Sequence, residues 1–145
     1  MDSPRQDLSR IFGIMILCGA VLVGTQSAWA QTFTVLHSFT GGGDGSAPIA
    51  GVTRNVAGDL YGTASSGGAG HGTVYKLTNK NGNWIFAPLY KFTGGSDGSG
   101  PSAGVVIGSN GTLYGTTSAG GSGCGASGCG TVFNLAISAQ PLEKV

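Results

Sequence analysis

Short apolar runs alternate with glycine-rich turns along most of the chain. Each run is rich in β-branched, aromatic and aliphatic residues and is bounded by Gly, Pro, Asn or Asp. This pattern is typical of strands joined by tight turns. Gly58 and Gly82 stand where hairpin turns require a positive φ. The pattern therefore predicts an all-β fold, with strands at about residues 49–55, 60–64, 73–78 and 84–92, then 103–107, 113–117 and 131–135.

The strand pattern is repeated. Residues 33–68 reappear 53 positions later as residues 86–121, and 21 of the 36 aligned positions are identical. A period of about 50 residues is typical of propellers and tandem arrays. Four antiparallel strands in one such period make a propeller blade. The sequence therefore predicts two propeller-type blades, from repeats at about 33–85 and 86–138.

The phase of the repeat predicts how the blades are completed. Residues 33–39 align with residues 86–92, the fourth strand of the first repeat. The chain thus contains an orphan fourth strand, one whole blade, and three strands without a fourth. Head and tail could pair to give two complete blades, but propellers usually have four to eight. We therefore expect self-association, for instance three chains in a six-bladed ring; the equal alternative is a fragment of a longer repeat protein.

The amino-terminal segment predicts export. Arg5 and Arg10 precede an apolar run at residues 11–24, and Ala28-Trp29-Ala30 fits an A-x-A cleavage site. The run is shorter than the roughly 20 apolar residues of a membrane-spanning helix, so an uncleaved anchor is the weaker interpretation. We predict a signal peptide at residues 1–30, a domain at 31–140 and a short tail at 141–145. The protein would then be secreted or held at the bacterial cell surface.

Charge adds little to this picture. Residues 31–145 carry five basic and four acidic side chains, a net charge of +1. Nucleic-acid binding requires a basic patch that neutralises phosphates, which these scattered charges do not form. The many glycines occupy fixed repeat positions between apolar runs, which favours order with tight turns over disorder.

A set of recurring motifs resembles a known family. The chain resembles the GloVer repeat of exported bacterial proteins through Phe39-Thr40-Gly41-Gly42, Asp44-Gly45, Pro48, Gly58, Leu60-Tyr61-Gly62-Thr63, Gly67-Gly68, Gly72-Thr73-Val74-Tyr75-Lys76-Leu77, Leu113-Tyr114-Gly115-Thr116-Thr117 and Gly130-Thr131-Val132-Phe133-Asn134-Leu135. The resemblance implies a tandem-repeat protein without an established activity, often joined to a surface-anchoring segment. The tail at 136–145 is too short and polar to be such an anchor. The order of elements is also similar to gluconolactonase-type and NHL-type blades, an analogy of fold alone.

Two cysteines lie in the five-residue insertion that distinguishes the second repeat. In an exported protein we expect Cys124 and Cys129 to form a local disulfide. On the chain-entropy estimate, a disulfide that closes a loop this small stabilises the fold by roughly 2 kcal/mol. The alternatives are a redox pair or two ligands of a metal site.

Few residues indicate catalysis or metal binding. Asp44 and Asp97 stand at equivalent places and could serve calcium, which needs six to eight oxygen ligands. Each loop has a single carboxylate, however, and a turn-forming Asp explains both positions. His37 aligns with Tyr90 and His71 with Cys129, so neither histidine recurs, and no motif links them to a nucleophile. We predict no catalytic residue, metal or cofactor.

The aromatic residues supply the remaining candidates. At alternate strand positions they mostly serve the core, but blade junctions also offer aromatic clefts on which sugar rings stack. Trp84 and Tyr114 are the candidate ligand contacts. The sequence thus predicts a non-catalytic binding or structural module, with a glycan as the candidate ligand. The alternative is a fragment or subunit of a gluconolactonase-like propeller hydrolase, although four acidic residues hardly supply its metal site.

Overall fold

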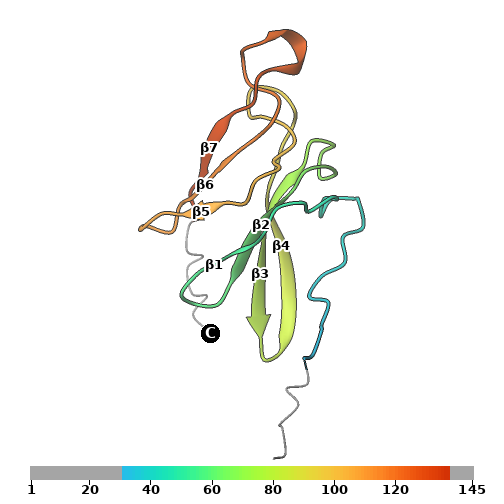
Figure 1. Ribbon diagram of the computed structural model, residues 1–145, viewed down its shortest axis with the longest axis vertical. Coiled ribbons are helices and arrows are strands. Elements are labelled where there is room, and N and C mark those ends of the chain that lie inside the picture. The colour runs from blue at the N-terminus through green and yellow to red at the C-terminus, as the bar shows by residue number, and fades with distance from the viewer. Residues whose placement is uncertain (1–30, 138–145) are drawn as a thin grey trace, which may run out of the picture. The chain divides into compact units, whose positions relative to one another are not determined.

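The computed structural model describes residues 31–137, which form two antiparallel sheets (Figure 1). The predicted signal peptide at 1–30 and tail at 141–145 lie outside these residues. Contacts divide the chain after Phe33, and both sheets lie in the unit that begins at Thr34. The all-β fold class is confirmed. The first sheet has the order β1 (Thr53–Arg54), β2 (Leu60–Ala64), β3 (Thr73–Lys80) and β4 (Asn83–Lys91); the second has β5 (Val106–Ile107), β6 (Leu113–Thr116) and β7 (Val132–Leu135), with a 3-10 turn η2 (Gly125–Ser127) before β7.

The β3–β4 hairpin is the longest ladder in the described residues. Asn81 and Gly82 both have positive φ, as a tight two-residue hairpin turn requires. A register shift between Val74 and Tyr75 marks a bulge near the far end. Pro88 lies opposite Tyr75, and it is tolerated because β4 is an edge strand of this sheet.

The opening strand of each sheet is shorter than predicted. Strands were expected at 49–55 and 103–107, yet β1 and β5 contain two residues each. The segment before β5 contributes to the contact between the sheets. The Thr63 hydroxyl donates to the Ala103 carbonyl at 2.9 Å, and the Thr53 hydroxyl donates to the Val105 carbonyl. The carbonyls of Ala103 and Val105 thus accept from side chains of the first sheet, outside the β5–β6 ladder.

The expected orphan strand at residues 33–39 is wrong. The backbone from 31 to 40 forms no strand, and Val35 is exposed. This segment instead contributes rings to a face of the first sheet. His37 stacks on Phe86 at 4.0 Å between ring centroids, and Phe39 meets Tyr75 edge-on at 5.2 Å. Aromatic packing therefore places these residues on the sheet surface without strand pairing.

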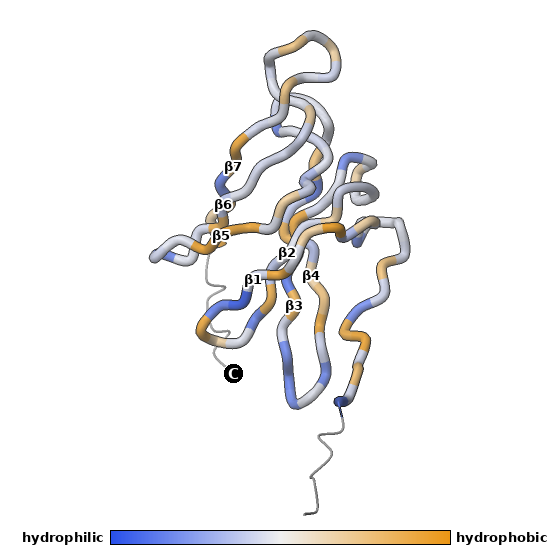
Figure 2. Tube along the Cα trace, viewed as in Figure 1, coloured by the Kyte–Doolittle hydropathy of each residue, from blue (hydrophilic) through white to orange (hydrophobic). Residues whose placement is uncertain are grey.

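The two sheets pack face to face around one buried cluster. Tyr61 and Val74 come from the first sheet and Leu113 from the second, whereas Phe92 and Val105 come from the segment that joins the sheets. All five are almost completely buried. Figure 2 shows that the tip of the β3–β4 hairpin is hydrophilic. Burial of this cluster is therefore the main apolar contact between the sheets.

Glycine is required in β6 because an aromatic ring lies against it. A Cβ on Gly115 would come within 2.5 Å of the Phe133 ring, and one on Gly62 would come equally close to the Tyr75 hydroxyl. Cross-strand Gly–aromatic pairing thus occurs in both sheets, at Gly62↔Tyr75 and Gly115↔Phe133.

We expect Gly115→Ala to destabilise the fold by about 1–3 kcal/mol, the usual cost of overpacking. Gly51→Ala is the matched control, because a Cβ there meets nothing within 4 Å and the φ of Gly51 is not positive. Urea unfolding followed by circular dichroism measures both. Equal midpoints for the two variants would contradict the packing role of Gly115.

Candidate functional site

Two glycine-rich loops are built around an aspartate in the same way. The carboxylate of Asp44 accepts hydrogen bonds from the Thr40 amide at 2.9 Å and the Thr40 hydroxyl at 2.6 Å. The carboxylate of Asp97 accepts from the Thr93 amide at 2.8 Å and the Thr93 hydroxyl at 2.7 Å. Each carboxylate closes its own turn, as expected for aspartate in turns.

An aromatic residue seven positions earlier supplies a further contact to each carboxylate. His37 Nε2 lies 3.2 Å from Asp44 Oδ2, and the Tyr90 hydroxyl donates to Asp97 Oδ2 at 3.1 Å. His37 and Tyr90 are aligned in the sequence repeat. The first repeat has a histidine at this position and the second a tyrosine, and each contacts the carboxylate of its own loop.

These hydrogen bonds keep both loop carboxylates ionised. Donation from the Thr40 hydroxyl and amide, aided by His37, lowers the pKa of Asp44 from 3.8 to about 2. For Asp97 burial raises the pKa, but hydrogen bonds from Thr93 and Tyr90 outweigh it, so the pKa is lowered. Both side chains are thus hydrogen-bond acceptors at neutral pH.

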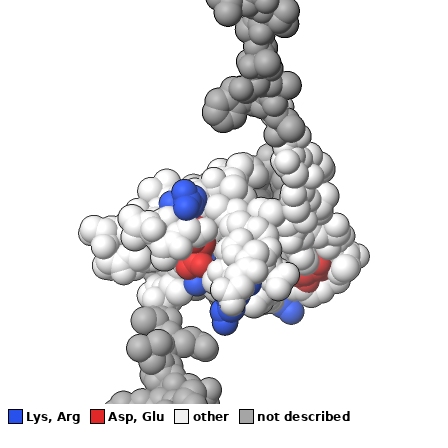
Figure 3. All heavy atoms as spheres, turned by 90° about the horizontal axis from the view of Figure 1, so that it is seen from below, with Lys and Arg blue, Asp and Glu red and all other residues white. Residues whose placement is uncertain are grey.

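The third aspartate among the described residues, Asp59, also has hydrogen-bonding and ion-pair partners. Asp59 Oδ2 lies 2.8 Å from Lys76 Nζ, and the Asp59 amide donates to the Asn55 side chain at 2.8 Å. Burial raises the pKa of Asp59, but hydrogen bonds led by that from Lys76 outweigh it and lower the pKa. On the face seen in Figure 3, groups of both signs lie close to one another and no patch of one sign covers the surface.

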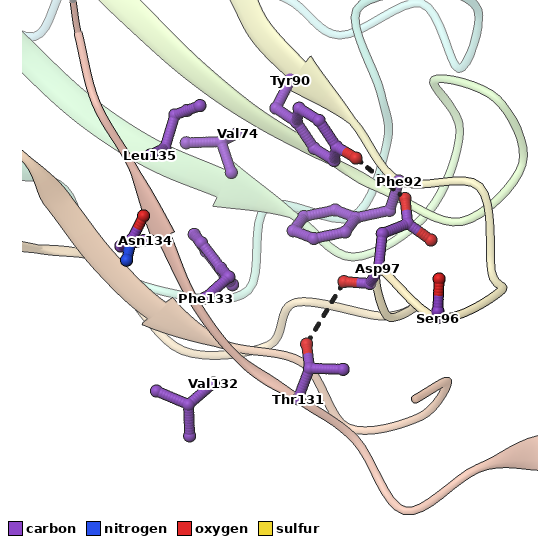
Figure 4. Close-up of a pocket in the computed structure, with 10 residues that line it drawn as sticks. All are labelled: Val74, Tyr90, Phe92, Ser96, Asp97, Thr131, Val132, Phe133, Asn134 and Leu135. Atoms are coloured by element: carbon purple, nitrogen blue, oxygen red, sulfur yellow. Dashed lines mark hydrogen bonds between the residues drawn. The ribbon is translucent and has the colours of Figure 1, made fainter. Parts of the chain in front are cut away.

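A pocket of about 310 Å³ lies beside Asp97, between β4 and β7 (Figure 4). Phe92 and Phe133 give it an apolar wall, and Tyr90 is 38% exposed. Figure 4 shows the Tyr90 hydroxyl directed at the Asp97 carboxylate. Polar and aromatic groups thus converge here on one concave surface, the usual composition of a small-molecule site. The lining residues are Val74, Tyr90, Phe92, Ser96, Asp97, Thr131, Val132, Phe133, Asn134 and Leu135.

The two predicted ligand contacts lie outside this pocket. Trp84 pairs with Asn79 close to the β3–β4 tip, and Tyr114 lies on β6 opposite Val106. Neither lines the pocket, and neither lines a larger hollow of about 760 Å³ formed by β3, β4 and residues 135–137. Sequence reasoning missed Tyr90 as a pocket residue, although its spacing of seven from Asp97, like that of His37 from Asp44, was a usable signal.

The histidines take part in loop contacts. His71 Nδ1 lies 3.1 Å from the Ser99 hydroxyl, and the His71 carbonyl accepts from the Gly100 amide at 3.0 Å. Within residues 31–137, no group of three or more His, Cys, Asp or Glu side chains could hold a metal ion. The same residues contain no helix that is long and apolar enough to cross a membrane.

The cysteine loop is closed on itself. A disulfide joins Cys124 to Cys129, whose Cα atoms are 5.4 Å apart, and η2 lies between them. Cys124 has a positive φ, which is uncommon for a residue with a side chain. The insertion of the second repeat is thus a compact loop between β6 and β7.

Comparison with known proteins identifies the family. The Gloeobacter/Verrucomicrobia repeat matches residues 18–145, most of the chain. The chain belongs to this repeat family. The GloVer resemblance of the sequence motifs is thereby confirmed. No curated protein and no solved structure gives a significant match.

The Asp44 loop of this family member predicts a pH dependence. Because the folded pKa is about 2 and the ordinary value is 3.8, the carboxylate stabilises the fold above about pH 4 and loses this effect as the pH falls towards 2. We expect Asp44→Asn to lower the melting temperature at pH 6. The difference in melting temperature between the variant and the wild type should become smaller between pH 4 and pH 2. Thermal melts followed by circular dichroism check this. A gap that stays constant over that range would show that the carboxylate charge is irrelevant.

The disulfide between Cys124 and Cys129 leads to a prediction for the number of reactive thiols. In the chain from Gln31 onward, Cys124 and Cys129 are the two cysteines. We expect no reactive thiol under denaturing conditions without reductant and two after reduction. The double variant Cys124→Ser/Cys129→Ser should lose roughly 2 kcal/mol or less of stability, because the closed loop is short. Two reactive thiols before reduction would contradict the disulfide.

Proposed function

We propose that this chain is an exported, non-catalytic module of its repeat family that binds a saccharide at the bacterial cell surface. In this proposal the two sheets are neighbouring blades of a partial propeller. Their face-to-face packing and the 53-residue sequence period support it. The signal-peptide pattern before Gln31 supports export.

The observation that carries the proposal is the composition of the pocket beside Asp97. Tyr90 offers a partly exposed ring and Asp97 an ionised carboxylate on the same surface. Sugars present apolar CH faces and hydroxyl groups, which such a set can stack against and hydrogen-bond. The volume of about 310 Å³ is at the small end for ligand sites and suits one or two sugar rings.

The same geometry favours binding over catalysis. The carboxylates of Asp44 and Asp97 each accept hydrogen bonds from the loop threonines, which hold them in turns. General acid–base chemistry needs a positioned group whose pKa lies near the operating pH. The pKa of Asp97 is instead lowered. These carboxylates are therefore acceptors for ligand hydroxyls rather than proton donors.

A glycan array followed by calorimetry tests the proposal. We expect a saccharide ligand to be found and Tyr90→Ala to weaken its binding about tenfold, equivalent to roughly 1.4 kcal/mol. Trp84→Ala is the matched control, since this aromatic residue lies on the same strand outside the pocket. The proposal fails if no saccharide binds, or if Trp84→Ala removes binding that Tyr90→Ala leaves intact.

A further inference from the structure

The residues that join the two sheets recur elsewhere in the chain. The buried cluster consists of Tyr61, Val74, Phe92, Val105 and Leu113. Each has an identical residue at the aligned position of the other repeat, 53 positions away, or 58 beyond the insertion. The aligned residues are Tyr114, Val132, Phe39, Val52 and Leu60, in the same order.

The aligned residues are much less buried than the cluster. Val74 is 0% exposed whereas Val132 is 83% exposed, and Tyr114 and Val52 are 43% and 52% exposed. Phe39 and Leu60 are half-buried, although the equivalent Phe92 and Leu113 are buried. The chain therefore displays, uncovered, a second copy of the residues with which its own sheets pack.

These residues form two separate surfaces. The first, which we call the leading face, comprises Phe39, Val52 and Leu60 and belongs to the first repeat. The second, the trailing face, comprises Tyr114 and Val132 on β6 and β7. Tyr114 follows Leu113, which is buried against the first sheet, and alternate residues of a strand point to opposite sides. The trailing face is therefore the side of the second sheet that points away from the first.

The leading face lies on the other side of the first sheet. Phe39 packs on Tyr75, which is adjacent in β3 to Val74 of the buried cluster. In the second sheet the equivalent ring, Phe92, packs on Phe133 and is covered by the cluster that contains Val74. Phe39 has its aromatic neighbour but lacks the covering valine. This is the position that a Val132 side chain from another copy would fill.

We propose that the trailing face of one chain stacks on the leading face of a second copy, and so repeats between chains the packing seen within one. Val132 covers Phe39 as Val74 covers Phe92. The Thr116 hydroxyl donates to the Ala50 carbonyl of the next copy, as Thr63 donates to Ala103. The Thr53 hydrogen bond has no counterpart, since Val106 stands at that position.

Two further features suit this arrangement. None of the residues that define the two faces is charged. Arg54 pairs with Leu60 beside the leading face, but β6 and β7 carry no charged residue, so no like charge on these strands opposes the contact. The faces differ from each other, so the contact is head-to-tail and continues to the next chain until a ring closes or a filament forms. A ring of three chains would contain six sheets, within the roughly four to eight blades of known propellers. This inference does not depend on saccharide binding.

The oligomeric state of the purified chain tests the proposal in the absence of saccharide. Size-exclusion chromatography with light scattering should show assemblies for the wild type. Val132→Arg blocks the trailing face and Val52→Arg blocks the leading face, so each variant alone should be a monomer. The matched control is Val56→Arg, because Val56 is fully exposed in the β1–β2 turn and belongs to neither face. It should assemble as the wild type does.

A mixture of the two blocked variants gives the sharpest test. Val52→Arg keeps an intact trailing face and Val132→Arg an intact leading face, so equal amounts should form a one-to-one dimer that grows no further. Circular dichroism confirms that both variants are folded, as the exposure of the two valines leads us to expect. A monomeric wild type at about 100 μM, a range in which even weak association is seen, would overturn the proposal. Folded variants that stay monomeric when mixed would overturn it equally.

Discussion

The packing of one sheet against the other through Phe92 is the interaction on which the rest of the structure depends. Phe92 follows β4 of the first sheet, yet its ring lies against Phe133 of the second and joins the cluster that contains Val74. Small sheets of three or four short strands have little core of their own, so this shared apolar contact supplies much of it. Phe92 also lines the pocket beside Asp97, between β4 and β7.

A second constraint comes from the glycine-rich loops. A chain with so many tight turns must satisfy the backbone groups that leave the ladders. The aspartates do this locally: Asp44 binds the Thr40 amide, and Asp97 binds that of Thr93. The side chain that completes each loop, His37 or Tyr90, comes from the aromatic run before it. The aromatic segments therefore help to hold the loops in place. The carboxylate that lines the pocket, that of Asp97, is also the one that closes its own turn.

The sequence predicted the regular parts of the fold and missed the irregular ones. The strand at residues 60–64 was predicted at its observed bounds because its residue types and the flanking turn residues are local signals. The strand at 33–39 was predicted from its alignment with residues 86–92 and was wrong, because a strand also needs a partner edge, which sequence similarity between repeats does not supply. Trp84 and Tyr114 were predicted as ligand contacts for their aromatic character. The pocket beside Asp97 was not predicted, because which elements meet around it, with Tyr90 among its lining residues, is not a local signal.

The sequence by itself determined the all-β class, the 53-residue period, the family and the pairing partners in hairpins, since these depend on residue type and spacing along the chain. Only the tertiary structure decided which of two identical residues is buried. Val74 and Val132 have the same side chain and equivalent strand positions, yet the first is covered and the second is open. Burial depends on what lies across the sheet face, and that neighbour is supplied by distant parts of the chain rather than by the residue itself.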